Sequence, residues 1–307
     1  MAWSASDIPD LTGRTAVVTG ANGGLGLETA RALAAHGAHV VMAVRNQQKA
    51  AEAVRSIHAT APDASLEQVA LDLSSQASVR EAAAQIAAAH PRLDLLVNNA
   101  GVMGIPERRN VDGFEMQLGT NHLGHYALTA LLLPALLAAG PARIVTVTST
   151  ARHMGRAVDP ANPHLDGRYG PWRAYGQSKL ANYHFGIGLH QRLRAAGVEA
   201  ASLIAHPGLS NTDLQAVSVR ETEGGLSQRF FHVLAGSSGM TPARGALPQL
   251  RAATDPAAGS GELYAPRYAS NGPPVRRPVL RRLGLRRAIE RLWEVSERET
   301  GLRCGVG

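Results

Sequence analysis

The 307-residue sequence predicts a single α/β domain, and three observations lead to this prediction. Short runs of β-branched and apolar residues alternate with longer helical patterns, as in repeated strand–helix–strand units. A glycine-rich turn at 20–26 joins the first strand to the first helix. Apolar residues make up 45% of the chain and aromatic residues only 4%, which suits aliphatic side chains packed between a sheet and helices. The expected architecture is a doubly wound parallel sheet of Rossmann type.

The elements follow one another in a regular order. The predicted strands are 15–19, 39–44, 66–71, 93–98, 143–149 and 199–205. The predicted helices are 27–36, 47–60, 78–90, 114–139 and 175–196. Gly37, Pro62, Pro91 and Gly197 end four of these helices, since glycine and proline are typical of residues just beyond a helix.

Two loop-rich segments interrupt the alternation, at 152–173 and 209–240. Both follow the carboxyl ends of strands, where sheets of this kind bind ligands. They are therefore candidates for the rim and lid of a substrate pocket, with 209–240 as a substrate-loop insert in the single domain 1–307. Surface decoration is the alternative interpretation.

The net charge of +7 arises mainly in the last part of the chain, where seven arginines lie between Arg276 and Arg291. Leucines, an isoleucine and a tryptophan alternate with them, which predicts a basic amphipathic C-terminal helix over 276–299. Such a helix can pack on the body with solvated arginines, or it can make a weak peripheral contact with anionic lipid. No nucleic-acid-binding motif accompanies the charge, so nucleic acid is not an expected partner.

The location expected from the sequence is cytoplasmic. Cys304 is the only cysteine, so no disulfide can form within the chain, as is usual in a reducing compartment. The first residues lack the pattern of a signal peptide, and no apolar segment is long enough to span a membrane.

The turn at 20–26 has the features of a phosphate-binding loop. Gly20, Gly24 and Gly26, with Asn22 and Leu25 between them, would place free N–H groups of a helix start against a pyrophosphate. The second strand then ends in Arg45 and Asn46. NAD sites usually have an acidic residue here, whereas arginine can bind the 2′-phosphate of NADP. NADP, as NADPH, is thus favoured over NAD, and a solvated surface arginine is the alternative reading of Arg45.

Tyr175 and Lys179 are spaced i, i+4 on a predicted helix and so share one face. A nearby ammonium stabilises a phenolate, which would lower the pKa of Tyr175 and make it a usable acid or base. Ser149 at the end of the fifth predicted strand could hydrogen-bond a substrate oxygen. Taken alone the spacing is weak, and its position after the other motifs gives it weight.

Together these motifs resemble the short-chain dehydrogenases/reductases over almost the whole chain. The resemblance implies catalytic roles for Asn121, Ser149, Tyr175 and Lys179, with Ser149 also contacting substrate. It implies further cofactor contacts by Asp72, Leu73, Asn98, Asn99, Ala100, Gly101, Pro207, Gly208 and Thr212, beside Tyr175 and Lys179 themselves. Segments 112–115, 121–125, 178–182 and 292–296 resemble the branch that holds retinol dehydrogenases, the WW-domain-containing oxidoreductase and protochlorophyllide reductase.

The resemblance implies hydride transfer between NADP(H) and a carbonyl or alcohol. Ser149 and Tyr175 would hold the carbonyl oxygen, and Tyr175 would donate the proton. Lys179 would lower the pKa of Tyr175 and bind the nicotinamide ribose, and Asn121 would hold a water that relays protons. Apolar residues in 209–240 suggest an apolar substrate such as a retinoid, steroid or polyketide.

Several alternatives remain open. A nucleotide-binding regulator of the same fold would need no complete catalytic set, and an epimerase or dehydratase would show a different turn and a larger C-terminal domain. His122 and His125 are spaced i, i+3, but no cysteine or acidic cluster completes a zinc site, so no metal is expected and both are interpreted as structural. A homodimer through helices 114–139 and 175–196 is possible.

Overall fold

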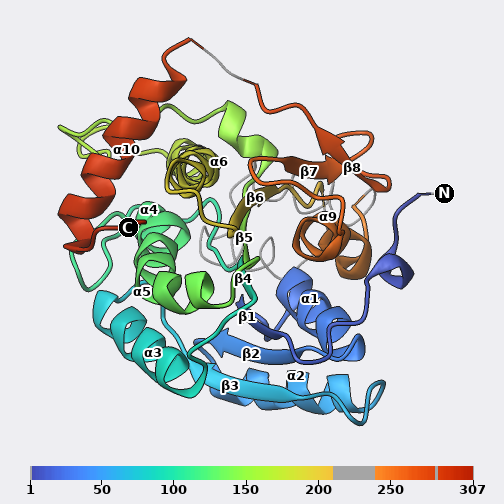
Figure 1. The fold of residues 1–307 in the computed structure, drawn as a ribbon. Helices are drawn as coiled ribbons and strands as arrows, with labels where there is room; N and C mark the ends of the chain where they lie inside the picture. Colours follow the sequence, from blue (N-terminus) through green and yellow to red (C-terminus); the bar gives the residue numbers. More distant parts are fainter. Residues whose placement is uncertain (1, 210–238, 281–282, 307) are drawn as a thin grey trace.

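The computed structural model describes residues 2–209, 239–280 and 283–306 of the chain. Eight strands form one sheet in the order β3-β2-β1-β4-β5-β6-β7-β8 (Figure 1). All neighbouring strands are parallel except β7 and β8, which pair antiparallel. The predicted fold class, a single domain with a Rossmann-type sheet, is confirmed.

The bounds of the elements are as follows. The strands are β1 Thr15–Thr19, β2 His39–Val44, β3 Leu66–Ala70, β4 Leu95–Asn98, β5 Arg143–Val147, β6 Ala201–Ala205, β7 Leu263–Pro266 and β8 Pro274–Arg277. The main helices are α1 Gly24–Ala35, α2 Gln47–His58, α3 Gln76–Ala89, α5 Gly124–Ala138, α6 Pro171–Ala195, α9 Pro242–Thr254 and α10 Leu285–Thr300. The short helical turns are η1 Ala5–Asp7, α4 Met116–Leu118, η2 Gly119–Leu123 and η3 Thr150–His153.

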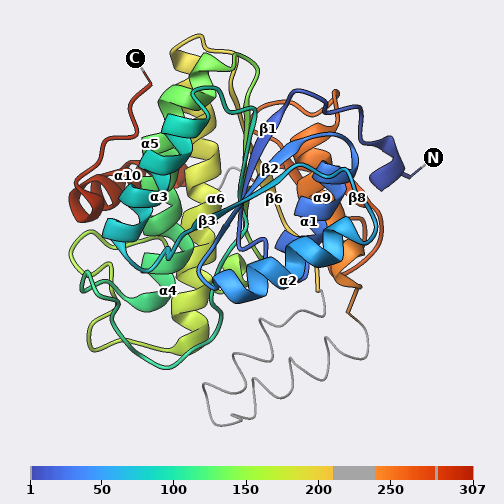
Figure 2. The same cartoon turned by 90° about the horizontal axis from the view of Figure 1, so that it is seen from below.

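The helices cover the sheet in two layers (Figure 2). Helices α3, α5 and α6 lie on one face, and α1, α2 and α9 lie on the other. Successive strand residues alternate between the layers, so Val17 belongs to the first apolar core while Ala16 and Val18 belong to the second. All three side chains are fully buried, which fixes the register of β1 at the centre of the sheet.

Three differences from the predicted elements affect the site. Strand β5 ends at Val147, so Thr148 and Ser149 follow it at the carboxyl edge of the sheet. Helix α6 begins at Pro171 rather than Tyr175, because proline is favoured in the first turn of a helix. The helix expected over 114–139 is instead α4, a π-helical turn η2 and α5.

Helix α10 packs its apolar side against α6. The ring of Trp293 stacks on Phe185 with centroids 5.4 Å apart, and the guanidinium of Arg192 lies 3.8 Å from the centre of the Trp293 ring. A Cβ atom at Gly188 would overlap this ring, so glycine permits the close approach. The predicted basic helix is therefore shorter than expected, since Arg276 and Arg277 belong to β8, and the packed interpretation of the tail is confirmed.

No helix within the described parts of the chain has both the length and the hydropathy needed to cross a membrane. The cytoplasmic location and the homodimer stay predictions. A dimer interface on the side of α6 that packs against α10 would have to include α10.

Replacing Trp293 by alanine should lower the free energy of unfolding by about 3–5 kcal/mol, because it removes a large buried ring and leaves a cavity between α6 and α10. Urea unfolding followed by circular dichroism measures the change. Glu294→Ala on the exposed side of the same helix is the matched control and should change stability by less than about 0.5 kcal/mol. Equal effects of the two substitutions would contradict the packing role of Trp293.

Candidate active site

Two cavities meet at the carboxyl edge of the sheet. One has a volume of about 380 Å³ and the other about 430 Å³. Leu25, Asn99, Gly101 and Met103 line both, so the two form one continuous cleft. The first cavity lies over the glycine-rich turn, and the second contains Ser149, Tyr175 and Lys179.

The first cavity has the features of a dinucleotide-phosphate cradle. Gly20 and Gly24 adopt left-handed backbone angles, with φ of +68° and +52°. A Cβ atom at Gly26 would overlap the carbonyl oxygen of Gly20, so the turn can close over the start of α1 only with glycine there. No side chain caps α1 at Gly23, which leaves N–H groups of its first turn for an anionic ligand.

The far end of this cavity is cationic. Arg45 and Asn46 line it as predicted, together with Lys49, which the sequence analysis missed. Asn46 caps α2 by accepting a hydrogen bond of 2.9 Å from the Lys49 backbone, so the turn that follows β2 brings Lys49 beside Arg45. Among the described residues lining this cavity, Asp72 has the only carboxylate, and its Oδ1 accepts hydrogen bonds from the backbone and hydroxyl of Ser74. These donors and charges fit the phosphate groups of a dinucleotide.

Most predicted cofactor residues lie on this cleft. The residues that line one or both cavities are Gly20, Asn22, Gly24, Leu25, Gly26, Arg45, Asn46, Asp72, Leu73, Asn99, Ala100, Gly101, Tyr175, Lys179, Pro207 and Gly208. Asn98 lies outside both cavities, buried in the sheet, where its Nδ2 donates to the Thr129 hydroxyl at 3.0 Å. Thr212 and residues 210–238 of the expected substrate loop lie outside the described residues.

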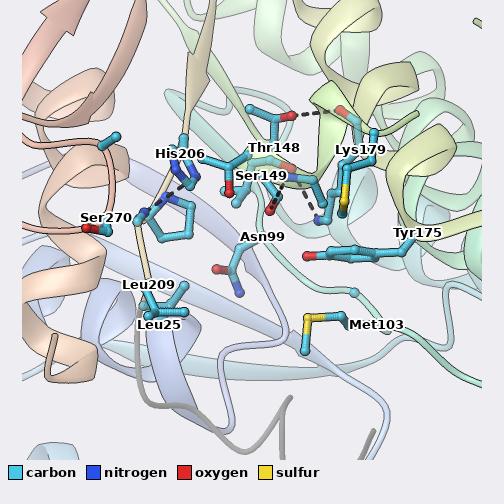
Figure 3. A pocket seen from close by; sticks show the side chains of 18 of the residues that line it. Leu25, Asn99, Met103, Thr148, Ser149, Tyr175, Lys179, His206, Leu209 and Ser270 are labelled. Carbon is cyan, nitrogen blue, oxygen red and sulfur yellow. Dashed lines mark hydrogen bonds between the residues drawn. The ribbon is translucent and has the colours of Figure 1, made fainter. Parts of the chain in front are cut away.

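Three side chains converge in the second cavity (Figure 3). Tyr175 and Lys179 come from one face of α6, and Ser149 comes from the cap of η3 just beyond β5. Ser149 is hydrogen-bonded to the Tyr175 side chain. Lys179 Nζ donates to the carbonyl oxygen of Val147 at 3.4 Å and lies 5.9 Å from the centre of the Tyr175 ring. The end of β5 therefore holds both the serine and the lysine in place.

Burial sets the protonation of Tyr175 and Lys179. It raises the pKa of Tyr175 to about 12, although the hydrogen bond from Ser149 acts in the opposite direction. Burial also lowers the pKa of Lys179 to about 8. For Tyr175, burial is thus the larger cause of the shift and the Ser149 hydrogen bond the smaller, opposing one, and the expectation that Lys179 lowers the pKa of Tyr175 stays a prediction. Tyr175 is neutral at pH 7, the form that can donate a proton.

Asn121 lies on the π-helical turn η2 and does not line either cavity. Its Oδ1 accepts from the Val102 backbone at 2.8 Å, and its Nδ2 donates to Val102 O and Ser178 Oγ, each at 2.9 Å. The side-chain amide is therefore committed to holding the strand-end segment and α6 together. A water held by Asn121 would have to share its backbone carbonyl oxygen with His125 Nδ1, which donates to that oxygen at 2.9 Å.

The histidines near the cleft are buried. Burial lowers the pKa of His122 to about 3 and of His125 to about 4, so both are neutral at pH 7. His122 is hydrogen-bonded to Ser296, and His125 to Thr19 Oγ1 and the Asn121 carbonyl. These partners support the structural interpretation of both residues. His206 lines the second cavity, and burial lowers its pKa to about 3.

The substrate side of the cavity is largely apolar. Its walls include Met103, Met154, Trp172 and Leu209, together with Ala269 from the loop between β7 and β8. Met154, Trp172 and Leu209 lie within the segments 152–173 and 209–240 that were expected at the pocket rim, whereas the sequence analysis did not point to Met103 or Ala269. Only the fold brings them to one surface.

The fold, the glycine turn and the Ser149–Tyr175–Lys179 cluster define an oxidoreductase that binds a nicotinamide nucleotide. The family model described as short chain dehydrogenase matches residues 14–223, and the chain belongs to this family, the short-chain dehydrogenases/reductases. Human retinol dehydrogenase 13 is 42% identical over 205 residues, which cover 66% of this chain and 61% of that protein. The predicted resemblance to the retinol dehydrogenase branch is confirmed.

Solved structures agree. A Mycobacterium paratuberculosis protein described as uncharacterized has 38% identity and a TM-score of 0.81, with all of both chains covered. A candidate NAD(P) dependent gluconate 5-dehydrogenase from Beutenbergia cavernae, solved with bound NADP at low occupancy, has 28% identity and a TM-score of 0.64. That match covers 83% of this chain and 96% of the other.

Lys179→Met should raise thermal stability at pH 7, because the buried ammonium disfavours the folded state below its pKa of about 8. The expected gain is on the order of 1–3 kcal/mol. As the pH rises from about 8 towards the ordinary lysine value of 10.5, the folded wild type has already released this proton while the unfolded chain still binds it. Wild-type stability should then rise towards that of the variant. A gap that widens over this range would contradict the assignment, and melting temperatures across the pH series measure it.

Proposed function

We propose that this protein reduces a carbonyl group to an alcohol with NADPH, and oxidises the alcohol in the reverse direction. The observation that carries the proposal is the convergence of Ser149, Tyr175 and Lys179 in a cavity continuous with the phosphate cradle. NADPH, when bound, supplies the hydride for the carbonyl carbon.

The residues of the chain handle the oxygen and the proton. The Ser149 and Tyr175 hydroxyls hold the carbonyl oxygen, and the raised pKa of Tyr175 keeps its proton in place until the oxygen becomes basic. Lys179 lies close enough to the Tyr175 ring to stabilise the phenolate that forms. The role expected for Asn121, holding a water that resupplies the proton, is part of the proposal; the water would share the Asn121 carbonyl oxygen with His125 Nδ1, since a carbonyl oxygen has two lone pairs.

Arg45 and Lys49 support NADP over NAD. Two cationic side chains at the end of β2 match the charge of a 2′-phosphate, and the chain has no carboxylate there to accept the ribose hydroxyls of NAD. The solved relative with bound NADP adds to this preference.

An apolar substrate fits the cavity best. Methionine, leucine and tryptophan side chains line the space of about 430 Å³ beside Tyr175. Relatives named retinol dehydrogenase and polyprenol dehydrogenase share 42% and 45% identity with the matched part of this chain. We therefore propose a retinoid-, steroid- or polyketide-like alcohol or carbonyl. A regulator without turnover is not favoured, because the catalytic set is complete.

Purified protein should oxidise NADPH in the presence of at least one member of a panel of apolar aldehydes and ketones that includes retinal and steroids. Tyr175→Phe should lower kcat by at least about 100-fold, because it removes the proton donor and keeps the ring. Stopped assays with NADPH and with NADH measure kcat for the wild type and for Tyr175→Phe. Tight NADPH binding with no turnover across the panel would favour the regulator, and failure to bind NADPH would overturn the proposal.

Arg45→Ala should raise KM for NADPH by about ten-fold or more and leave KM for NADH nearly unchanged, because only the 2′-phosphate uses the guanidinium. Steady-state kinetics with each cofactor measures the split. Arg55→Ala, an exposed arginine on α2 outside the cavity, is the matched control and should change neither value. A similar loss with both cofactors would show that Arg45 does not select NADP.

We also propose a weak contact with anionic membranes. The apolar side of α10 is used in packing, so the contact depends on the exposed side chains of Leu280 and Leu283 and on nearby Arg287 and Arg291. All four line a third cavity, which is separate from the active-site cleft, has a volume of about 420 Å³ and lies between η3, α6 and α10. Exposed leucines beside arginines suit the boundary of an anionic bilayer.

Vesicles rich in phosphatidylserine should co-sediment the protein at low salt and release it at high salt, because the arginine contribution is screened. Leu283→Ser should weaken sedimentation several-fold. Val111→Ser removes another strongly exposed apolar side chain, elsewhere on the surface, and should have no effect. The contact is excluded if the wild type stays in the supernatant at low salt.

A further inference from the structure

Three potential metal ligands converge at the edge of the sheet opposite the active site. His39 is the first residue of β2, Glu67 is the second residue of the edge strand β3, and His90 caps the end of α3. The cleft lies at the carboxyl ends of the strands, whereas these residues lie near the amino ends of β2 and β3. Neither the proposed reaction nor the cofactor site uses them.

The ligand atoms are already close together. Glu67 Oε2 lies 2.7 Å from His90 Nε2 and 3.5 Å from His39 Nε2. One ligand atom from each of the three residues lies within 4.8 Å of the others, and the two imidazole rings have centroids 5.0 Å apart. Zn–N and Zn–O bonds of about 2.0–2.2 Å place neighbouring ligands of a tetrahedral ion about 3.3–3.6 Å apart. Small movements of the three side chains would therefore bring the ligand atoms to the spacing of a tetrahedral zinc site.

The surroundings of His39 favour metal binding. Its Nδ1 is hydrogen-bonded to the Ser65 hydroxyl at 2.7 Å, which leaves Nε2 facing Glu67. A partner of this kind on the second ring nitrogen orients a metal-binding histidine. The side chains of His39, Glu67 and His90 are 30%, 27% and 17% exposed, so an ion can enter from solvent and keep a water in its remaining position.

We propose that His39, Glu67 and His90 form a binding site for a divalent transition-metal ion, with Zn²⁺ as the best match. Two imidazoles and one carboxylate select Zn²⁺, Co²⁺, Ni²⁺ or Cu²⁺ over Mg²⁺ and Ca²⁺, which prefer oxygen ligands. The ion would join β2, the edge strand β3 and the end of α3. Because the three residues are brought together only by folding, binding would stabilise the native state.

Titration of untagged, chelator-treated protein with Zn²⁺ in a calorimeter tests the site. The expected result is one ion per chain, together with a melting temperature that rises with Zn²⁺ concentration. His39→Gln and His90→Gln should each weaken binding by at least ten-fold, and Ser65→Ala should weaken it less. His58→Gln removes a half-buried histidine at the end of α2, outside the cluster, and should leave binding unchanged.

Spectroscopy of the Co²⁺-loaded wild type is independent of the variants and of their folding. Its X-ray absorption should report two imidazole nitrogens and at least one carboxylate oxygen around the ion. The proposal is overturned if wild-type binding is not one to one, if folded His39→Gln and His90→Gln proteins bind as the wild type does, or if Co²⁺ has fewer than two imidazole ligands. Each of these results would mean that Glu67 merely hydrogen-bonds two surface histidines.

Discussion

The hydroxyl of Thr19 is the interaction on which the cleft depends. It accepts hydrogen bonds from the backbone N–H groups of Asn99 and Ala100, at 2.9 and 3.0 Å, and it is hydrogen-bonded to His125 Nε2 at 2.9 Å. His125 in turn reaches the carbonyl of Asn121 through Nδ1. One fully buried oxygen at the end of β1 thus joins the glycine turn, the end of β4 and the π-helical turn. A buried polar network of this kind is stable only when each member is satisfied, which fixes the geometry of all three segments.

The same hydrogen-bond network explains why the site can contain the charged Lys179 and exchangeable protons, which a purely apolar core would exclude. Asn121 joins Val102 to Ser178, one residue before Lys179, so the floor of the cleft and the catalytic helix are held at one spacing. Within this frame the Lys179 ammonium donates to the Val147 carbonyl at 3.4 Å, and burial shifts its pKa downward. The chain therefore holds a buried lysine with a shifted pKa at the proposed reaction site, which lowers the stability of the folded state. The well-packed cores on either side of the sheet offset this cost.

Much of this arrangement could be predicted from the sequence. The strands β1 to β6 are short apolar runs between glycine and proline signals, and the predicted bounds of β1 and β2 are those observed. The glycine turn, Tyr175 and Lys179 could be predicted because their functions require fixed local spacing. Helix α9 and strands β7 and β8 gave no such signal, since Pro248 lies inside α9 and β8 is only four residues long. The π-helical turn, the apolar cavity wall and the pair of Lys49 with Arg45 depend on tertiary placement. The same holds for His39, Glu67 and His90, which lie 23 or more positions apart.

The packing of α10 also has a consequence for the order in which the protein is made. Phe185 and Gly188 form their contact with Trp293, about a hundred residues later in the chain. At ribosomal rates of about 5–20 residues per second, α6 waits several seconds for the helix that covers it. During that interval the nascent chain carries an uncovered strip of aromatic and aliphatic side chains. Such a strip is the surface that a chaperone acting on chains still attached to the ribosome would recognise.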